Sequence, residues 1–172
     1  MSFSVISNFR IDSEERLSRM KDSFLSFEKA SIDRWIINAR GPLANEALDF
    51  LRDNLGERLI ESKIETDKGW FHDTRLMLNS IESDYLLYWI EDQICLCGEN
   101  WLNEVFNEMR ALDVDYMGYS WFGLGVFIKE FENLPQRSLN CISVVNYDLA
   151  AHKLRIKNSY DLIGVRSAII SL

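Results

Sequence analysis

Short apolar runs alternate along the chain with longer segments in which apolar residues recur every three or four positions. The first run, residues 3–9 (FSVISNF), is typical of a buried strand. After it, the spacing of Leu17, Met20, Phe24 and Phe27 predicts an amphipathic helix whose charged residues lie on the opposite face. The chain therefore begins as a strand followed by a helix.

The alternation continues through most of the chain. Four more strands are predicted, at residues 34–38, 57–65, 85–90 and 114–122. The helices predicted between them lie within residues 42–56, 69–81 and 101–112. Pro42 near the start of the first of these helices and Gly56 at its end stand where these residue types usually occur. Beyond residue 123 the pattern weakens, although residues 139–147 and 162–171 each have the composition of a strand.

Strands that alternate with helices predict an α/β protein, here a three-layer α/β/α sandwich with a mostly parallel central sheet. We expect the first four strands to be parallel and the strands at residues 3–9 and 34–38 to be neighbours. The most apolar run, residues 85–90, is expected to be the central strand. At 172 residues the chain fits a single domain.

Composition narrows the classes of function. The apolar fraction of 47% and the charged fraction of 27% are those of a soluble globular protein. A net charge of −8 and a pI of about 4.8 argue against a nucleic-acid-binding protein, because such binding needs Lys and Arg to neutralise phosphates. A local basic cluster would still suit a small phosphorylated ligand.

The cysteines and the N-terminus bear on the cellular location. The cysteines are Cys95, Cys97 and Cys141, and the C-x-C pair alone does not predict a zinc site, because such a site needs about four ligands and there are only two histidines. An odd cysteine count and an N-terminus that lacks the features of a signal peptide predict reduced thiols in the cytoplasm. No run approaches the roughly 20 apolar residues of a transmembrane helix. We therefore expect a cytoplasmic protein with no membrane span.

The apolar run at residues 85–90 ends in two adjacent carboxylates, Glu91 and Asp92. In an open α/β sheet, ligands bind at the carboxyl ends of the strands. Two adjacent carboxylates repel one another unless a cation is near, and Mg²⁺ usually binds through one or two carboxylates plus substrate phosphates. The pair therefore indicates a cation site for a diphosphate. The alternative interpretation is that the two acids begin a solvated loop after a buried strand.

This order of elements resembles the nucleotide-binding half of the GT-A glycosyltransferases. Residues 84–92 (DYLLYWIED) are similar to the family's fourth strand and its acidic end, the DXD motif. The segments SVISNFR and RLSRMKDSFLSF are similar to the family's first strand, polar turn and helix. The resemblance covers about residues 2–122. It implies a single domain in which residues 1–122 bind a nucleotide sugar and residues 123–172 form a reduced acceptor-side half.

The resemblance implies a role for each residue of the acidic motif. Glu91 and Asp92 occupy the first two acidic positions, where the family contacts the nucleotide sugar and the metal. Gln93 occupies the third position, commonly a metal-binding Asp, and a neutral amide oxygen is a poorer ligand for a hard cation. A divalent cation, Mn²⁺ or Mg²⁺, is therefore implied, with Asp92 as its favoured ligand.

Contacts with the nucleotide sugar are implied at the ends of other strands. Asn8 and Arg10 follow the first strand, and Asn38 and Arg40 follow the second. Arg75 lies near the basic residue that meets the nucleotide in the family. Arginine also suits a diphosphate by its own chemistry, since it forms bidentate hydrogen bonds. The alternative for each arginine is an ion pair with a surface carboxylate.

We expect Glu91 and Asp92 to lie in the largest cleft. The helix predicted over residues 69–81 is expected to bury Phe71, Leu78 and Ile81 while Arg75 faces that cleft. An inverting transferase would also need a carboxylate base on the acceptor side. The candidate bases are Glu130, Glu132 and Asp148.

Three functions remain open. The first is a glycosyltransferase that moves a sugar from a nucleotide-diphosphate sugar to the hydroxyl of a saccharide or other acceptor. The second is a non-catalytic GT-A-like module that binds a nucleotide or a protein partner, which Gln93 favours. The third is an unrelated α/β domain, such as a nucleotidyltransferase of similar layout.

Overall fold

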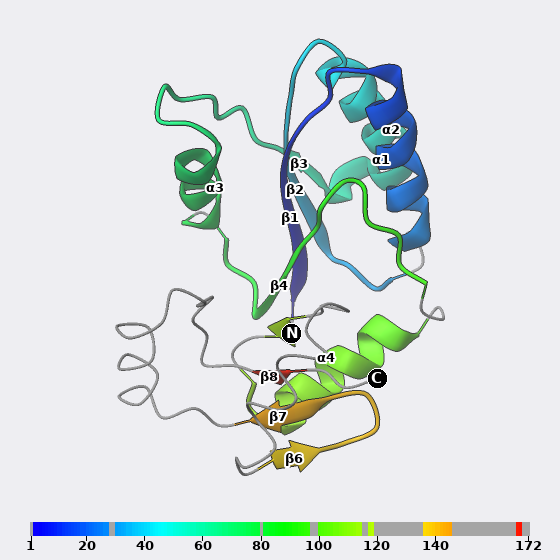
Figure 1. The fold of residues 1–172 in the computed structure, drawn as a ribbon, viewed down its shortest axis with the longest axis vertical. Helices are drawn as coiled ribbons and strands as arrows, with labels where there is room; N and C mark the ends of the chain where they lie inside the picture. The colour runs from blue at the N-terminus through cyan, green and yellow to red at the C-terminus, as the bar shows by residue number, and fades with distance from the viewer. Residues whose placement is uncertain are drawn as a thin grey trace. The chain divides into compact units, whose positions relative to one another are not determined.

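The structure is a computed structural model that describes residues 2–27, 30–79, 81–96, 100–114, 117–118, 136–145 and 168–169. The chain divides into two compact units, Met1–Asn100 and Trp101–Leu172 (Figure 1). The sequence pattern instead divides a nucleotide-binding half from an acceptor half near residue 122, and that functional division stays a prediction.

A four-stranded parallel sheet forms the centre of the first unit. Its strands, in the spatial order β3-β2-β1-β4, are β1 (Phe3–Arg10), β2 (Arg34–Arg40), β3 (Leu59–Glu61) and β4 (Tyr85–Tyr88). All three pairings are parallel, and β1 pairs directly with β2. The prediction of four parallel strands with the first two adjacent is confirmed.

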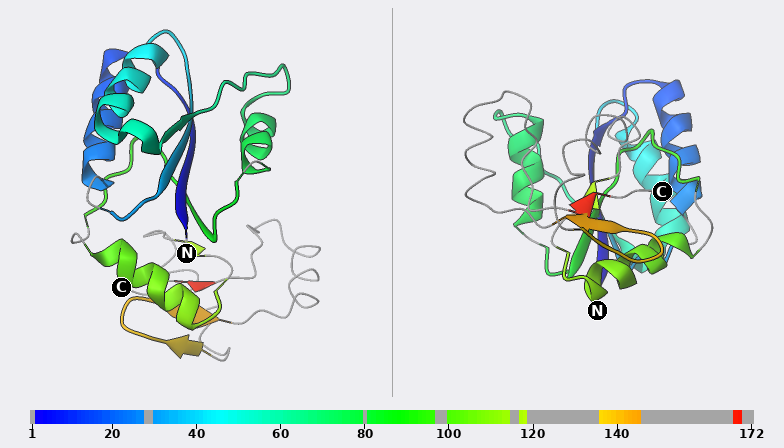
Figure 2. Two further views of the ribbon diagram at one scale, coloured as in Figure 1. Left: turned by 180° about the vertical axis from the view of Figure 1, so that it is seen from behind. Right: turned by 60° about the horizontal axis from the view of Figure 1, so that its bottom comes forward.

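Helices cover both faces of this sheet. They are α1 (Glu14–Phe27), α2 (Ala44–Leu55), which continues into the single turn η1 (Gly56–Arg58), and α3 (Trp70–Leu78). Helices α1 and α2 lie on one face and α3 lies on the other (Figures 1 and 2). The unit is therefore the predicted sandwich of helix, sheet and helix.

The core on the side of α1 and α2 is aromatic. Phe24 of α1 packs edge-on against Trp35 of β2, with ring centroids 5.2 Å apart. Trp89 contacts both of these rings and also Phe9 of β1. Since Trp35, Trp89 and Phe24 are almost completely buried, their apolar area contributes strongly to stability. On the other face, Ile6 and Ile36 pack against Met77 of α3.

Strand β4 differs from its prediction. It ends at Tyr88 rather than at residue 90, and it lies at the edge of the sheet that the structure describes, paired with β1. Within the part of the chain that the structure describes, β4 has a single neighbour, and the predicted central position is not borne out there. The central strands are β1 and β2, and seven of the eight residues of β1 are buried although Ser4, Ser7 and Asn8 are polar. Apolar content alone therefore did not reveal which strand is covered on both faces.

A tight turn after β2 brings together the segments that leave β1 and β2. Gly41 has a φ of 98°, and a Cβ there would lie 2.4 Å from the carbonyl oxygen of Ile11. The Ile11 N–H donates to the Arg40 carbonyl at 2.8 Å, and the Ile11 carbonyl accepts from the Leu43 N–H at 3.2 Å. Only glycine fits this close approach without strain.

The second unit contains one helix and a small sheet. These are α4 (Trp101–Ala111), β5 (Met117–Gly118), β6 (Gln136–Ser138), β7 (Ser143–Val145) and β8 (Ala168–Ile169). Strands β6, β7 and β8 are antiparallel, and β5 is parallel to β8. Helix α4 and the strands β5, β7 and β8 each fall within a segment that the sequence predicted for them. Strand β6 was not predicted.

Glu108 of α4 ties the β6–β7 turn to the helix. Its buried carboxylate accepts from the backbone N–H groups of Asn140, Cys141 and Ile142 at 2.7–2.9 Å. Burial raises the pKa of the Cys141 thiol, and the carboxylates of Glu108 and Glu104 raise it further.

Within the described residues, no helix has the length and apolar character needed to cross a membrane.

Candidate functional site at the carboxyl edge of the sheet

The strand register gathers the sequence-predicted polar residues at the carboxyl ends of β1 and β2. Asn8 lies opposite Asn38, and Arg10 lies opposite Arg40. Alternate residues of a strand share a face, so these four side chains lie on the same face as Ile6, the face that α3 covers. The carboxyl ends of β1 and β2 therefore bring together residues that are 30 positions apart in sequence.

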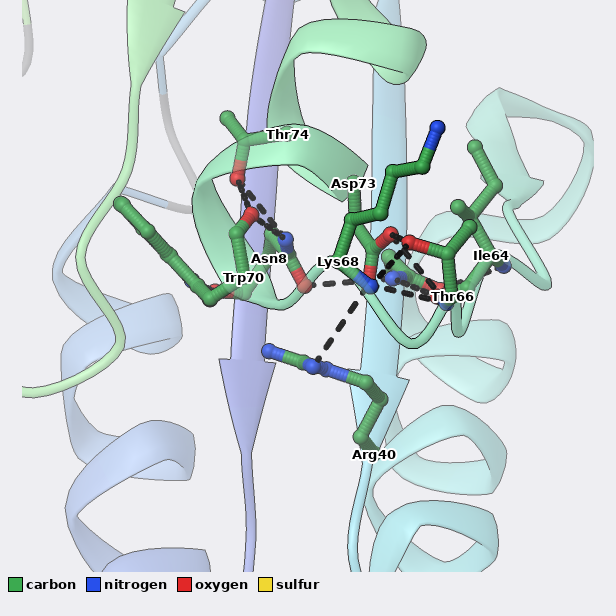
Figure 3. A network of polar contacts seen from close by, with 9 residues as sticks. Asn8, Arg40, Ile64, Thr66, Lys68, Trp70, Asp73 and Thr74 are labelled. Carbon is green, nitrogen blue, oxygen red and sulfur yellow. Dashed lines mark hydrogen bonds and ion pairs between the residues drawn. The ribbon is translucent and has the colours of Figure 1, made fainter.

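Asn8 ties α3 to the sheet (Figure 3), and Asn38 supports Asn8 from the neighbouring strand. Asn8 Nδ2 donates to the Trp70 carbonyl at 3.1 Å and to Thr74 Oγ1 at 2.8 Å. Asn38 Nδ2 donates to Asn8 Oδ1 at 3.1 Å. Asn38 also exchanges two hydrogen bonds with the backbone of Ile64, at 2.7 and 3.1 Å. Both amides are buried, and their N–H donors bond within the chain, so they stabilise the packing of these segments. A contact of either amide with a nucleotide stays a proposal.

Arg40 and Asp73 form the charged part of the same network. Asp73 is fully buried and accepts from the backbone N–H of Thr66 at 3.2 Å and from its hydroxyl at 2.6 Å. Arg40 Nη1 lies 3.8 Å from Asp73 Oδ2, and the Arg40 side chain is only 15% exposed. Its buried Nε–H has no hydrogen-bond partner among the residues that the structure describes. Arg40 therefore retains donor capacity at the edge of the sheet.

Helix α3 packs a different face against the sheet from the one that the sequence predicted. Its buried residues are Asp73, Thr74 and Met77, whereas Phe71 is 77% exposed and Leu78 is 45% exposed. The predicted burial of Phe71 and Leu78 is wrong, because the polar partners supplied by β1, β2 and the preceding loop draw Asp73 and Thr74 inward. Ile81 packs against the cluster of Ile6, Ile36 and Met77, so its predicted burial is partly confirmed.

Arg75 is exposed on this helix. The buried residues of α3 follow the spacing i, i+1 and i+4 from Asp73, which leaves Arg75 off the face that packs on the sheet. Asp73, two residues before Arg75 on the same helix, faces Arg40. A contact between Arg75 and a nucleotide stays a proposal.

The acidic motif forms a tight turn after β4. The Trp89 N–H donates to the Ile6 carbonyl at 2.9 Å and so extends the pairing with β1 by one residue. The Gln93 N–H donates to the Ile90 carbonyl at 3.1 Å, which places Glu91 and Asp92 at the two central positions of a β-turn. The two acids lie beyond the carboxyl end of the fourth strand, as predicted, but Trp89 and Ile90 separate them from its last residue, Tyr88. The described residues do not test whether a cleft surrounds them.

Serines of α1 and β1 fix this turn in place. The Ser23 hydroxyl is buried, accepts from Trp89 Nε1 at 2.9 Å and donates to the Gln93 carbonyl. The Ser26 hydroxyl accepts from the Cys95 N–H at 2.8 Å, and Ser7 Oγ donates to the Trp89 carbonyl at 2.6 Å. These four contacts lie on both sides of the two acids, so the backbone of the turn is held at both ends.

The two acids of the turn have different surroundings. The Glu91 side chain is 14% exposed, and its Oε1 lies 3.5 Å from Arg16 Nη2. Asp92 is exposed, as is Gln93. Among the described residues, no three His, Cys, Asp or Glu side chains gather in a way that would hold a metal ion. A single free carboxylate is nevertheless compatible with Mg²⁺ or Mn²⁺, which takes its other ligands from water and substrate phosphates.

Two aromatic residues beside the network were not predicted as site residues. Trp70 donates its Nε1–H to the Asn8 carbonyl, and its ring meets that of Tyr88 edge-on at 6.2 Å. Partial burial raises the pKa of the Tyr88 hydroxyl, the Glu91 carboxylate raises it further, and a hydrogen bond with Thr74 opposes the shift. Trp70 and Tyr88 are 44% and 38% exposed, so an aromatic surface adjoins the polar edge.

The candidate catalytic bases Glu130, Glu132 and Asp148 lie outside the residues that the structure describes. Their proposed role remains a prediction from the sequence.

Comparison with known proteins identifies the class of fold. No protein-family model and no curated protein matches the sequence. Two solved structures of S. aureus TarS, a GT-A glycosyltransferase, are similar to the chain. For the first, the TM-score is 0.53 at 18% identity, over 68% of this chain and 21% of TarS. For the second, TarS 1-349, the TM-score is 0.55 at 17% identity, over 80% of this chain and 42% of the other.

The α/β fold with its four parallel strands and flanking helices is therefore of the GT-A type, as the sequence predicted. The chain spans less than half the length of the TarS structures that it matches. At this level of identity the likeness concerns the fold.

Proposed function

We propose that the first unit binds a nucleotide-diphosphate sugar at the carboxyl edge of its sheet, and that the protein transfers the sugar to an acceptor hydroxyl. The observation that carries the proposal is the anchored acidic turn, because it follows the fourth strand of a GT-A fold at the edge where such sheets bind ligands. The donor would be the partner in this binding, and a saccharide or other hydroxyl compound would be the acceptor.

Charge complementarity supports a diphosphate ligand. Arg10 and Arg40 lie opposite one another at the ends of β1 and β2, and the Arg40 Nε–H has no partner among the described residues. Arginine binds phosphate oxygens through paired N–H groups. Asp92 would hold a divalent cation, which when bound supplies positive charge to the leaving diphosphate. Arg75 and the amides of Asn8 and Asn38 are secondary candidates for contact with the donor.

A non-catalytic binding module is the second candidate function. It is favoured by the pairing of Glu91 with Arg16 and by the neutral Gln93, since the acidic turn then keeps one free carboxylate. Such a module would bind a nucleotide sugar without turning it over. A transferase that inverts the anomeric centre needs a base for the acceptor hydroxyl, whereas a binding module does not. The candidates for this base are Glu130, Glu132 and Asp148.

Isothermal titration calorimetry against UDP-, GDP-, dTDP- and CMP-sugars, with and without Mn²⁺, tests the proposal. We expect one nucleotide-diphosphate sugar to bind with a dissociation constant between about 1 μM and 1 mM, or about −8 to −4 kcal/mol, and to bind more tightly with Mn²⁺. CMP-sugars, which have one phosphate, are expected to bind less well. Failure of every donor to bind would contradict the proposal. Binding without release of the nucleotide in the presence of acceptors would favour the non-catalytic module.

A further inference from the structure

The order of the strands identifies one position in the parallel sheet, between β1 and β4, as the expected place for a ligand. Strands β1, β2 and β3 follow one another in one direction across the sheet, and β4 lies on the other side of β1. In open α/β sheets, ligands bind beyond the carboxyl ends of the strands, at the point where the strand order reverses. Side chains that lie between the ends of β1 and β4 are therefore the first candidates for contact with a ligand.

Trp70, the first residue of α3, lies at this point. Its ring nitrogen donates to the carbonyl of Asn8, near the end of β1, and its own carbonyl accepts from Asn8 Nδ2 at 3.1 Å (Figure 3). Its ring meets that of Tyr88, the last residue of β4, edge-on, with the ring centroids 6.2 Å apart. Trp70 therefore contacts the ends of both strands, and these two contacts hold its ring in one orientation.

The Trp70 ring remains accessible although it is held. Trp70 is 44% exposed, whereas Trp35 and Trp89, on the other face of the sheet, are 1% and 2% exposed. The ring N–H is already bonded within the chain, so the rest of the ring surface is apolar. Nucleic-acid bases stack on such rings, and a ring that is ordered before binding loses little side-chain entropy when a base arrives.

The other predicted contacts for the nucleotide do not offer a surface of this kind. Asn8 and Asn38 are 4% and 1% exposed, so a planar base finds almost no side-chain area on them. The Arg40 side chain is 15% exposed and faces Asp73. Beside these buried polar groups, Trp70 supplies an exposed and rigid aromatic ring.

We propose that Trp70 stacks on the base of the donor nucleotide and that Tyr88 fixes the orientation of the Trp70 ring. The inference rests on the proposed function, because it names the side chain that holds the base of the same donor. Every base has an aromatic face, so stacking contributes affinity for nucleoside diphosphates as a class and does not select one base. The choice of base would then come from other contacts.

Calorimetric titration with UDP, GDP, dTDP and pyrophosphate in the presence of Mn²⁺ tests this inference. Trp70→Leu is expected to weaken each nucleoside diphosphate that binds by about five-fold or more, because the aromatic stacking surface is lost. Pyrophosphate, which has no base, should behave alike with the parent protein and with Trp70→Leu.

Phe71→Leu is the matched control for this substitution. Phe71 is the next residue of α3 and is 77% exposed, but it lies off the face formed by Asp73, Thr74 and Met77 that packs on the sheet. The control removes an exposed aromatic ring from the same helix and should change nucleotide affinity by less than about two-fold.

Trp70→Phe separates stacking from the hydrogen bond to Asn8. Phenylalanine keeps an aromatic face but has no ring N–H, so nucleotide binding should weaken by less than about three-fold. In the parent protein, a bound nucleoside diphosphate should quench indole fluorescence, because the base lies against the Trp70 ring. In Trp70→Phe the nucleotide should still bind, but this quenching should be largely lost. Thermal unfolding of each variant verifies that it is folded.

The outcomes distinguish this inference from the proposed function. If Trp70→Leu binds nucleoside diphosphates as tightly as Phe71→Leu does, the inference is overturned and the proposed function stands. The inference is also overturned if Trp70→Leu weakens pyrophosphate as much as the nucleotides. A loss confined to nucleotide sugars, with their nucleoside diphosphates unaffected, would overturn it by placing Trp70 against the sugar. Failure of every nucleotide and nucleotide sugar to bind the parent protein would overturn the inference and the proposed function together.

Discussion

Replacement of Asp73 by alanine is expected to lower the free energy of unfolding by about 3–5 kcal/mol, the cost of breaking a buried ion pair by removing one partner. The Asp73 carboxylate is fully buried and faces Arg40. It accepts hydrogen bonds from the backbone N–H and the hydroxyl of Thr66. Without it, the largely buried Arg40 guanidinium would lose its counter-ion while its Nε–H already lacks a described partner. Urea unfolding monitored by circular dichroism measures the loss.

Asp67→Ala provides the control for this measurement. Asp67 belongs to the same loop but is exposed, so its removal should cost less than about 0.5 kcal/mol. Asp73→Asn should fall between the two, because the amide keeps an acceptor for Thr66 but removes the charge facing Arg40. A loss below about 1 kcal/mol for Asp73→Ala would show that the network does not hold α3 against the sheet.

Asp92→Asn is expected to weaken Mn²⁺-assisted binding of the donor by about ten-fold or more, or at least about 1.4 kcal/mol. Asp92 has a formal negative charge to offer to the cation, whereas Gln93 has only an amide dipole. Gln93→Ala should therefore weaken binding by less than about three-fold, or about 0.65 kcal/mol. Because both side chains are exposed, neither substitution should change the melting temperature appreciably.

Calorimetric titration of the two variants with donor and Mn²⁺ compares them directly. Equal losses would mean that the third position of the acidic motif still supplies a necessary ligand. Unchanged binding in Asp92→Asn would remove this carboxylate from the site. Either result would require a different account of the turn after β4.

The elements of the first unit were predictable because their signals are local. The spacing of Leu17, Met20 and Phe24 predicted the buried face of α1, and all three side chains are buried. Gly56 was expected at the end of α2, and it adopts a positive φ of 55° there. Alternation of strands and helices then implied a parallel sheet, since parallel neighbours need a crossover between them.

The rotation of α3 and the position of β4 were not predictable from the same signals. Sequence periodicity treats Asp73 and Thr74 as solvent-facing, yet both are buried because partners from β1, β2 and the loop at residues 64–66 satisfy them. Likewise, the apolar run that forms β4 says nothing about which strands flank it. Both features depend on contacts between segments that are distant in sequence.

The candidate site was predictable in part. The acidic turn and the residues at the ends of β1 and β2 lie at one edge of the sheet, as the strand pattern implied. The contribution of α1 was not visible, because Ser23 lies 70 positions before Gln93 and serines have no distinctive pattern. Asn8 and Asn38, predicted as ligand contacts, also bond to one another and to other segments of the chain, which the sequence did not indicate.

The central claim is that a nucleotide-diphosphate sugar binds at the carboxyl edge of the parallel sheet. Nuclear magnetic resonance of the ¹⁵N-labelled protein, titrated with the donor that binds in calorimetry, tests it most directly. We predict that the largest amide shift changes occur in residues 8–11, 38–41 and 90–93, and that they diminish in Asp92→Asn. Shift changes confined to α4 and the β6–β7 hairpin, with these three segments unaffected, would contradict the account.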